Sequence, residues 1–325
     1  MRKIIGIFIS LAFVGGAFFM LNQEEPSTKK FIENNFINQD EKIKTYIKEK
    51  EFLTESIGFY MQFLLQTNQE KAFQQQTRIV QEISQGGFVP WRSQDAHSNA
   101  SVDDLRIMKS LYEGANKWDG KYETTANEIK SFLKEHQMKD NLIVDFYDMN
   151  SEKASEEVHL SYIDAEALDY FDPPIKEAHE KLLRKVKDEV YFPEVYQVDS
   201  EKFKYQSEVN MIDQSLIALN SSLLGFQPDS FFAFVEEEMR ETGRIYGRYD
   251  RSTREPTVTY ESPSVYAFLT MTYIENENLN DARTFYERMK ELQTDDGGYK
   301  SSDDNAHFFD NILPAIAEER FLNYS

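Results

Sequence analysis

The sequence predicts an all-α fold in which inner and outer helices alternate around a ring, an α/α toroid. Helical periodicity runs through nearly the whole chain, and helices that are apolar all round alternate with strongly amphipathic ones. Glycine-centred turns also recur between these segments, which makes a weak internal repeat of outer helix, turn and inner helix. A helical solenoid would produce a similar pattern, so periodicity alone leaves that alternative open.

Twelve helices are expected after a short polar stretch near the N-terminus. In chain order they cover residues 28–47, 52–66, 69–84, 102–116, 121–137, 160–170, 173–188, 208–224, 228–241, 262–274, 278–292 and 306–319. Segments such as 208–224 and 262–274 are apolar almost all round and are expected in the inner ring. Segments such as 69–84 and 278–292 are amphipathic and highly charged, which is typical of outer helices.

Several of the outer helices are predicted to end in the same way. In Gln85-Gly86-Gly87-Phe88 and in Thr242-Gly243-Arg244-Ile245-Tyr246 glycine ends a helix and an aromatic residue begins a short extended piece. Short β turns are therefore expected at the ends of the inner helices. Residues 140–160 are acidic, with Asp145 among them, and are expected to form a long surface loop or hairpin.

Composition limits the possible partners and cofactors. The formal net charge of −21 comes from 57 acidic and 36 basic residues, which disfavours binding to nucleic acid and to anionic polymers. A neutral or cationic substrate is expected, although the same charge could serve solubility alone. The chain has no cysteine, so it offers neither disulfides nor lipid attachment through cysteine, and its five histidines show no metal-ligand spacing. We expect no metal and no cofactor.

The first residues indicate export. Arg2 and Lys3 precede an uncharged, largely apolar run from Ile4 to Leu21, and basic residues before such a run favour an N-terminus inside the cell. An uncleaved signal-anchor at 1–21 is favoured over a cleaved signal peptide because Phe18 to Leu21 extend the run beyond its small residues. A polar tether at 22–28 and one working domain at 29–325 would follow. We expect that domain outside the cytoplasm, tethered to the membrane or alternatively secreted.

Three segments in order carry the chemistry of a candidate active site. Leu53-Thr54-Glu55-Ser56-Ile57-Gly58-Phe59-Tyr60-Met61 is followed by Phe88-Val89-Pro90-Trp91-Arg92 and then by Asn99-Ala100-Ser101-Val102-Asp103-Asp104-Leu105-Arg106-Ile107. A glutamate among apolar residues favours its neutral form, which is the state that donates a proton to a glycosidic oxygen. Gly58 is expected to leave room for a sugar. The alternative role of Glu55 is that of a first-turn acid at a helix N-terminus.

The order and spacing of these segments resemble glycoside hydrolase family 8. In that family a Ser-Glu-Gly segment carries the general acid, an Ala-Trp-Arg segment follows, and an Ala-Thr-Asp-Ala-Asp-Leu stretch opens another helix. The resemblance implies an (α/α)6 barrel with the substrate lying across a cleft, and it implies Glu55 as the acid. It places the base at Asp213, an acid in an apolar helix, although Ile212 and Leu216 replace the tyrosine and arginine of the family segment.

The third segment departs from the family pattern. Asp104 aligns with the second aspartate of the family stretch, so the resemblance implies that it contacts sugar. Ser101 and Asp104 also have the spacing of a helix capping box, which is the structural alternative. Val102 stands where the family has its first aspartate, and this puts the usual substrate, the way it is held, or activity itself in question.

Aromatic and basic residues elsewhere complete the predicted site. Aromatic rings stack on sugar faces and arginine binds hydroxyl groups, so such residues are expected along the cleft. The predicted substrate-binding residues are Asp104, Trp91, Arg92, Tyr249, Asp250 and Tyr260, and Asp250 and Glu261 are alternative second carboxylates. Asp310 is a further inner-helix acid, for which a structural role is expected.

These observations predict an exported glycoside hydrolase that cleaves a β-linked bacterial polysaccharide, an exopolysaccharide or a glucan. By resemblance the mechanism is inverting, with the carboxyl groups of Glu55 and Asp213 roughly 6.5–9.5 Å apart. The main alternative is a catalytically degenerate polysaccharide-binding or assembly factor of an exopolysaccharide system. A lyase on the same fold is a third candidate, but such enzymes usually act on acidic sugars. A monomer that binds polysaccharide and no nucleic acid is expected.

Overall fold

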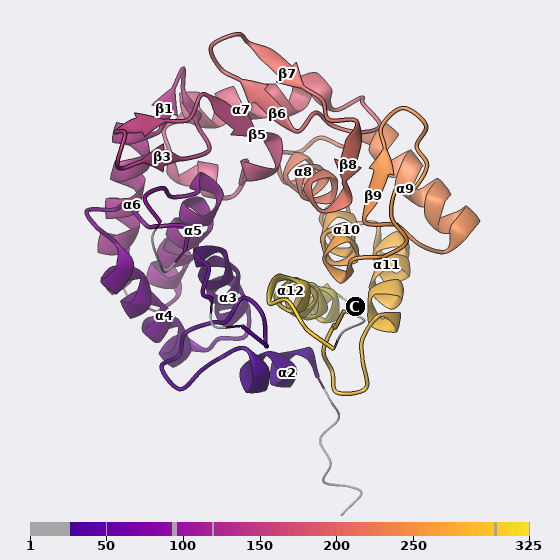
Figure 1. The fold of residues 1–325 in the computed structure, drawn as a ribbon, viewed down its shortest axis with the longest axis horizontal. Coiled ribbons are helices and arrows are strands. Elements are labelled where there is room, and N and C mark those ends of the chain that lie inside the picture. Colours follow the sequence, from indigo (N-terminus) through magenta and orange to yellow (C-terminus); the bar gives the residue numbers. More distant parts are fainter. Residues whose placement is uncertain (1–26, 50, 93–95, 119, 302–303, 325) are drawn as a thin grey trace, which may run out of the picture.

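The computed structural model describes residues 27–49, 51–92, 96–118, 120–301 and 304–324, so the predicted signal-anchor lies outside the described residues. Viewed down its shortest axis, the protein is a double ring of helices (Figure 1). The inner ring consists of α3 (Thr54–Gln66), α5 (Ser101–Trp118), α8 (Met211–Leu223), α10 (Pro263–Glu275) and α12 (Phe309–Tyr324). Around it lie α2 (Thr28–Asn35), α4 (Glu70–Ile83), α6 (Glu123–His136), α7 (Pro173–Val186), α9 (Asp229–Thr242) and α11 (Leu279–Glu291). The predicted toroid is confirmed.

Burial follows the inner and outer positions that the sequence predicts. In α10 every residue from Ser264 to Ile274 is buried, because this helix packs on α8, α11 and α12. In α11 only Ala282, Phe285 and Met289 are buried, a spacing of three and four residues that forms one helical face. The core therefore lies between the two rings and between neighbouring inner helices.

The sixth inner position differs from the sequence prediction. A helix over 160–170 was expected, but the chain forms two short 3₁₀ helices, η2 (Leu160–Tyr162) and η3 (Ala167–Tyr170). The side chain of Asp164 accepts a hydrogen bond of 2.9 Å from the amide of Ala167, which starts a new turn and prevents a continuous helix. This interruption brings the side chains of η2 to the end of the barrel where the neighbouring inner helices begin.

The first predicted helix, 28–47, is also shorter than expected. It ends at Asn35, and Phe36 is its C-cap. The side chain of Asn38 then accepts hydrogen bonds from the amides of Asp40 and Lys42, and this local turn competes with a continued helix. Thr28, predicted as the last tether residue, is the first residue of α2.

The extended pieces between helices form four small antiparallel sheets, which confirms the expected short β turns. They are β1 (Met138–Lys139) with β2 (Leu142–Ile143), β3 (Tyr147–Asp148) with β4 (Lys153–Ala154), β5 (Glu157–His159) with β6 (Val195–Gln197) and β7 (Lys202–Lys204), and β8 (Glu208–Asn210) with β9 (Arg248–Asp250). A further 3₁₀ turn, η1 (Gly120–Tyr122), precedes α6. Residues 140–160 form hairpins as expected, but Asp145 within them is buried. None of the helices in the described part of the chain is long and apolar enough to cross a membrane.

Candidate active site

The N-terminal ends of the inner helices meet at one end of the barrel. The first turn of α3 and the second turn of α5 approach each other through Glu55 and Arg106, whose Oε1 and Nη1 atoms are 3.7 Å apart. The first turns of α10 and α12 are joined by the Ser264 hydroxyl, which donates a hydrogen bond of 2.6 Å to Asp310. Helix N-termini carry partial positive charge, so this end of the barrel is suited to holding carboxylates.

Glu55 lies in the first turn of α3, at the mouth of the site. Its side chain is 33% exposed, and its charged neighbour is Arg106. The expected apolar setting around Glu55 is therefore not found, because its neighbour Ile57 is buried in the core while the Glu55 side chain is partly exposed beside Arg106. Arg106 is buried and its guanidinium lies 4.1 Å from the centre of the Phe59 ring, which fixes its position.

Gly58 does not open space for a sugar, contrary to the sequence prediction. A Cβ atom at this position would lie 3.0 Å from the Cβ of Arg106 and 3.6 Å from Cγ1 of Ile107. The missing side chain instead allows α3 and α5 to pack closely. This close packing carries Arg106 to the side of Glu55.

Asp103 is a site residue that the sequence analysis missed. It is buried, and its Oδ1 lies 3.4 Å from Nη1 of Arg106, the same nitrogen that faces Glu55. Burial and then the charge of Glu55 raise the pKa of Asp103 to about 8, against the opposing effect of Arg106. The signal in the sequence was its position three residues before Arg106, which places both side chains on one helix face.

The two neighbours of Asp103 take no part in this pairing with Arg106. Val102 is buried, and Asp104 is completely buried. Asp104 accepts a hydrogen bond of 2.5 Å from Nδ2 of Asn99, whose own Oδ1 accepts one from the amide of Tyr147. Its pKa is raised well above the usual range, chiefly by burial. Asp104 thus lies in a hydrogen-bond network that ties α5 to β3, and α5 begins at Ser101 itself, so the predicted capping box is not formed.

Asp213 lies in the first turn of α8, because this helix begins at Met211 and not at residue 208 as the sequence predicted. β8 occupies Glu208–Asn210, and the side chain of Asn210 caps α8 by accepting a hydrogen bond from the amide of Ile212. Burial raises the pKa of Asp213, while hydrogen bonds from Ser161 and Asn210 and the charge of His159 oppose the shift. A buried carboxylate with a raised pKa is a better proton acceptor than an exposed one.

Residues of β5 and η2 lie between the Asp103 and Asp213 sides of the site. His159 Nδ1 is 2.7 Å from Oδ2 of Asp145, which orients the imidazole and, against its own desolvation, raises the pKa of His159. The pKa of Tyr162 is raised to about 12 by burial and then by the charges of Asp103, Asp145 and Asp213. Tyr162 therefore interacts electrostatically with the carboxyl groups on both sides of the site.

Trp91 and Arg92 stand beside Glu55. The amide of Thr54 donates to the Trp91 carbonyl over 3.1 Å, and Arg92 pairs with Leu53 in a β-bridge, so both residues are tied to the start of α3. The Arg92 guanidinium lies 4.9 Å from the centre of the Trp91 ring, and that ring is 37% exposed. These positions are compatible with the predicted contact with sugar.

Tyr260 lies on the other side of the site. Its ring is 53% exposed and borders a pocket of about 620 Å³, which is also lined by Ile212, the residue before Asp213. Gly247 packs under the ring, since a Cβ there would lie 2.3 Å from Cε2 of Tyr260. Tyr260 is therefore a supported aromatic surface at the mouth of the site.

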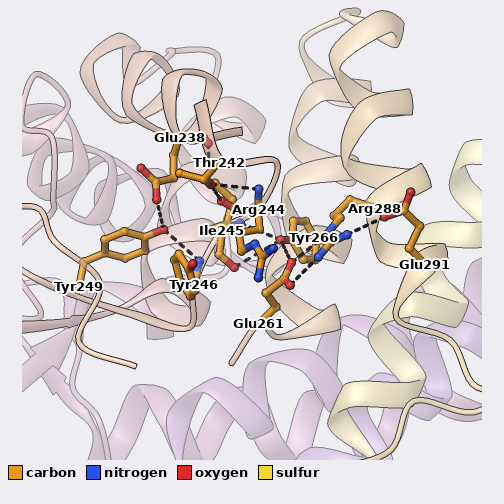
Figure 2. A network of polar contacts seen from close by, with 10 residues as sticks. All are labelled: Glu238, Thr242, Arg244, Ile245, Tyr246, Tyr249, Glu261, Tyr266, Arg288 and Glu291. Carbon is orange, nitrogen blue, oxygen red and sulfur yellow. Dashed lines mark hydrogen bonds and ion pairs between the residues drawn. The ribbon is translucent and has the colours of Figure 1, made fainter. Parts of the chain in front are cut away.

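Tyr249, Asp250 and Glu261 lie in polar networks of the scaffold. The Tyr249 ring is fully buried, and its hydroxyl donates to Glu238 over 3.0 Å (Figure 2). Asp250 accepts hydrogen bonds from the amides and hydroxyls of the turn that follows β9, which lower its pKa to about 2. Glu261 is paired with Arg288 of α11 and accepts a hydrogen bond from Tyr266 (Figure 2). These positions favour structural roles for the three residues, and nothing in them brings the side chains to Glu55.

In the described part of the chain, no group of three or more histidine, aspartate or glutamate side chains is placed to hold a metal ion. The arrangement of Glu55, Asp103 and Asp213 supports proton transfer by carboxyl groups, with Arg106 and Tyr162 between them.

Comparison with known proteins places the chain in a family. No family model matches it. The Bacillus subtilis (strain 168) protein named "Putative lipoprotein YdaJ" is 33% identical over 317 residues, which span 90% of this chain and 86% of that protein. PssZ from Listeria monocytogenes is 30% identical, with a TM-score of 0.81 over 91% of this chain and 96% of the PssZ chain. The chain belongs to the family of YdaJ and PssZ.

Solved structures of lower sequence identity share the fold of this chain. A novel α-amylase from Clostridium perfringens has a TM-score of 0.84 at 21% identity, over 90% of this chain and 96% of the amylase chain. The family 8 glycosyl hydrolase Cel10, an endoglucanase from Klebsiella pneumoniae, has a TM-score of 0.66 at 15% identity, over 92% of this chain and 99% of the Cel10 chain. The structural likeness to family 8 enzymes and the (α/α)6 barrel are thus confirmed, whereas the roles of Glu55 and Asp213 stay predictions.

Proposed function

We propose that the chain is an exported glycoside hydrolase that cleaves a β-linked bacterial polysaccharide by an inverting acid/base mechanism. The observation that carries this proposal is the meeting of Glu55 and Asp103 around Arg106, with Tyr162 linking them electrostatically to Asp213. Glycoside hydrolysis needs two carboxyl groups, one to protonate the leaving oxygen and one to activate water. A site at the open end of an α/α barrel is also where a polysaccharide can enter.

The two carboxyl groups would divide the work as follows. Glu55, a third exposed at the mouth of the site, would protonate the leaving oxygen. Asp213, half-buried and hydrogen-bonded by Ser161, would accept a proton from the attacking water on the opposite face of the sugar. This division requires the two carboxyl groups to be roughly 6.5–9.5 Å apart so that water fits between them and the substrate.

Asp103 supplies a carboxyl group near the position where the family aspartate is replaced by Val102. Val102 is buried and offers no carboxyl group, and the carboxyl group that shares Arg106 with Glu55 comes from the following residue, Asp103. A carboxyl group is therefore present on the α5 side of the site. This favours catalysis over a site that has lost a necessary acid.

The export part of the proposal rests on the apolar N-terminal run and on the name of YdaJ, which describes that protein as a lipoprotein. The present chain has no cysteine to carry a lipid, so the proposed tether is the apolar run from Ile4 to Leu21. Such a run has the length of a membrane span.

A second candidate function is a polysaccharide-binding or assembly factor of an exopolysaccharide system. Ile212 and Leu216 favour it, because they replace a tyrosine and an arginine next to the proposed base. The linkage is also part of the proposal, since an α-amylase shares the fold as closely as PssZ does. Direct measurement of cleavage separates these possibilities.

The test is release of reducing ends from β-glucans, α-glucans and amino-sugar exopolysaccharides by the full chain in detergent. The Glu55→Gln variant is expected to lose at least about a thousandfold in rate, since it keeps the shape but not the proton. Glu51→Gln, an exposed glutamate four residues earlier, is the matched control and should keep full activity. Proton NMR of the first product anomer would report inversion. Binding without cleavage by both Glu55 forms would favour the assembly factor.

A further inference from the structure

A pocket of about 620 Å³ lies at the N-terminal ends of α10 and α12, where Ser262, Pro263 and Asp310 line it. Its size falls in the range of roughly 300–1,000 Å³ that ligand sites usually have. Ile212 borders the pocket and directly precedes Asp213, so the pocket lies beside the first turn of the helix that carries the proposed base. Tyr260, Tyr46 and His307 are among the residues that line it, and the ring centres of Tyr46 and His307 are 4.5 Å apart. Flat aromatic rings that line a pocket suit the apolar face of a sugar ring.

Two of the charged groups of this pocket are already neutralised. Glu261 is bound by two guanidinium nitrogens of Arg288, at 2.8 Å from Nε and 2.5 Å from Nη2. Lys300 is bound by Asp296 at 2.6 Å and by Asp304 at 2.9 Å. Neither group has its charge free for a ligand.

Asp310 is different. Its Oδ1 accepts hydrogen bonds of 2.6 Å from the Ser264 hydroxyl and 3.2 Å from the Ser262 hydroxyl, so the carboxylate is held in one orientation. Within the described residues, Oδ2 has no hydrogen bond and no cation paired with it, and Asp310 lines the pocket. A fixed carboxylate with one free oxygen is a receptor for a hydrogen-bond donor.

We propose that this pocket is a subsite for a hexosamine residue with a free amino group, whose ammonium pairs with Asp310 while its ring stacks on Tyr260. This inference rests on the proposed function, since it assumes that the bound polymer is a polysaccharide. An ammonium forms a stronger, charge-assisted bond with a carboxylate than a sugar hydroxyl does. The net charge of −21 adds a long-range attraction for a cationic polymer.

A purely structural role for Asp310 makes a different prediction. In that case the carboxylate would only bridge α10 and α12 and interact with the N-terminal dipole of α12. Its removal would then lower stability without changing which sugar is bound. Asp310→Asn keeps an oxygen for the Ser264 hydroxyl and removes the charge, whereas Ser264→Ala breaks the bridge and keeps the charge.

The experiment measures binding by calorimetry of a β-1,4-linked glucosamine tetrasaccharide and of its N-acetylated counterpart at 0.15 M salt. The full chain carries Glu55→Gln throughout so that no cleavage occurs, and Asp310→Asn or Ser264→Ala is added to it. We expect the free-amine sugar to bind at least about tenfold tighter than the N-acetylated one. Asp310→Asn should abolish that difference, and Ser264→Ala should preserve it.

Three results would overturn the inference: equal affinity for the two tetrasaccharides, binding of neither, or a preference for the amine that persists in Asp310→Asn. Failure of the proposed function is distinguished by the separate cleavage assay on the unmodified chain. If the protein binds the amine through Asp310 but cleaves no polymer, the subsite is supported and the proposed hydrolase activity is wrong.

Discussion

At the scale of single residues, the charge of the site is set by one arginine shared between two acids. Nη1 of Arg106 lies 3.7 Å from Glu55 and 3.4 Å from Asp103. A single guanidinium cannot fully compensate two carboxylates, and the more buried acid, Asp103, holds its proton to about pH 8. Near neutral pH Asp103 is therefore mostly neutral, and Arg106 is left to face Glu55.

This arrangement predicts how stability depends on pH. Unfolded Asp103 loses its proton near a pKa of roughly 3.9, whereas folded Asp103 keeps it up to a pKa of about 8. Between these values the folded state binds one more proton than the unfolded state, so the free energy of unfolding falls as pH rises. Asp103→Asn removes this loss, and the variant should gain on the order of 1–3 kcal/mol relative to wild type between pH 5 and pH 8.

Urea unfolding at pH 5, 6.5 and 8 checks this prediction. Asp169→Asn, at a surface aspartate paired with Lys176, is the control and should run parallel to wild type over the same range. A stability difference between Asp103→Asn and wild type that does not change with pH would contradict the assignment.

At the scale of helices and turns, the sequence could predict what depends on periodicity. The inner helix at 262–274 was predicted within one residue of α10, because it is apolar all round and Pro263 marks its start. The expected helix at 160–170 was wrong because Asp164 bonds the amide of Ala167, a local interaction with no periodic signal. Asp103 was missed for a similar reason, since its partner Glu55 lies far away in sequence and only the packing of α3 on α5 brings them together.

The packing of α3 on α5 depends on Gly58. Gly58→Val would place a branched side chain against Arg106 Cβ, where even a single Cβ would lie at 3.0 Å. We expect a loss of about 1–3 kcal/mol in the free energy of unfolding, as is usual for overpacking, and a larger loss in cleavage rate because Arg106 is displaced from Glu55. Gly120→Ala is the control, because nothing lies within 4 Å of a Cβ there. Unchanged stability in Gly58→Val would show that α5 can move away freely.

The two 3₁₀ turns are held in place by a buried ion pair. Lys109 of α5 is buried and contacts Asp164 at 3.2 Å and Glu166 at 2.8 Å, both between η2 and η3. Lys109→Met would leave these acids without their cation, at a cost of about 3–5 kcal/mol in the free energy of unfolding. Lys176→Met, which removes an exposed pair with Asp169, should change it by less than about 1 kcal/mol. Thermal melts of both variants would measure the contrast, and equal melting temperatures would contradict it.

At the scale of the whole molecule, α2 determines where the chain leaves the barrel. The hydroxyl of Thr28, at the start of α2, donates to Glu318 in the last turns of α12, over 2.9 Å. Phe36, just after α2, contacts Phe308, just before α12, with ring centres 5.3 Å apart. The helices α2 and α12 are therefore antiparallel, and α2 begins at the end of the barrel opposite the candidate active site.

If the N-terminal run is a membrane anchor, as proposed, the cleft should face away from the bilayer. The absence of cysteine allows single labels to be introduced, Tyr260→Cys at the cleft and Leu322→Cys at the opposite end, where side chains are 53% and 65% exposed. With the full chain in phosphatidylcholine vesicles, a quencher attached to the lipid headgroups should reduce the fluorescence of a label at residue 322. The fluorescence of a label at residue 260 should stay unchanged. Equal quenching at both sites would mean that the barrel lies on its side or turns freely on its tether. Stronger quenching at residue 260 would place the cleft against the membrane, where a polymer in the cell wall could not enter it.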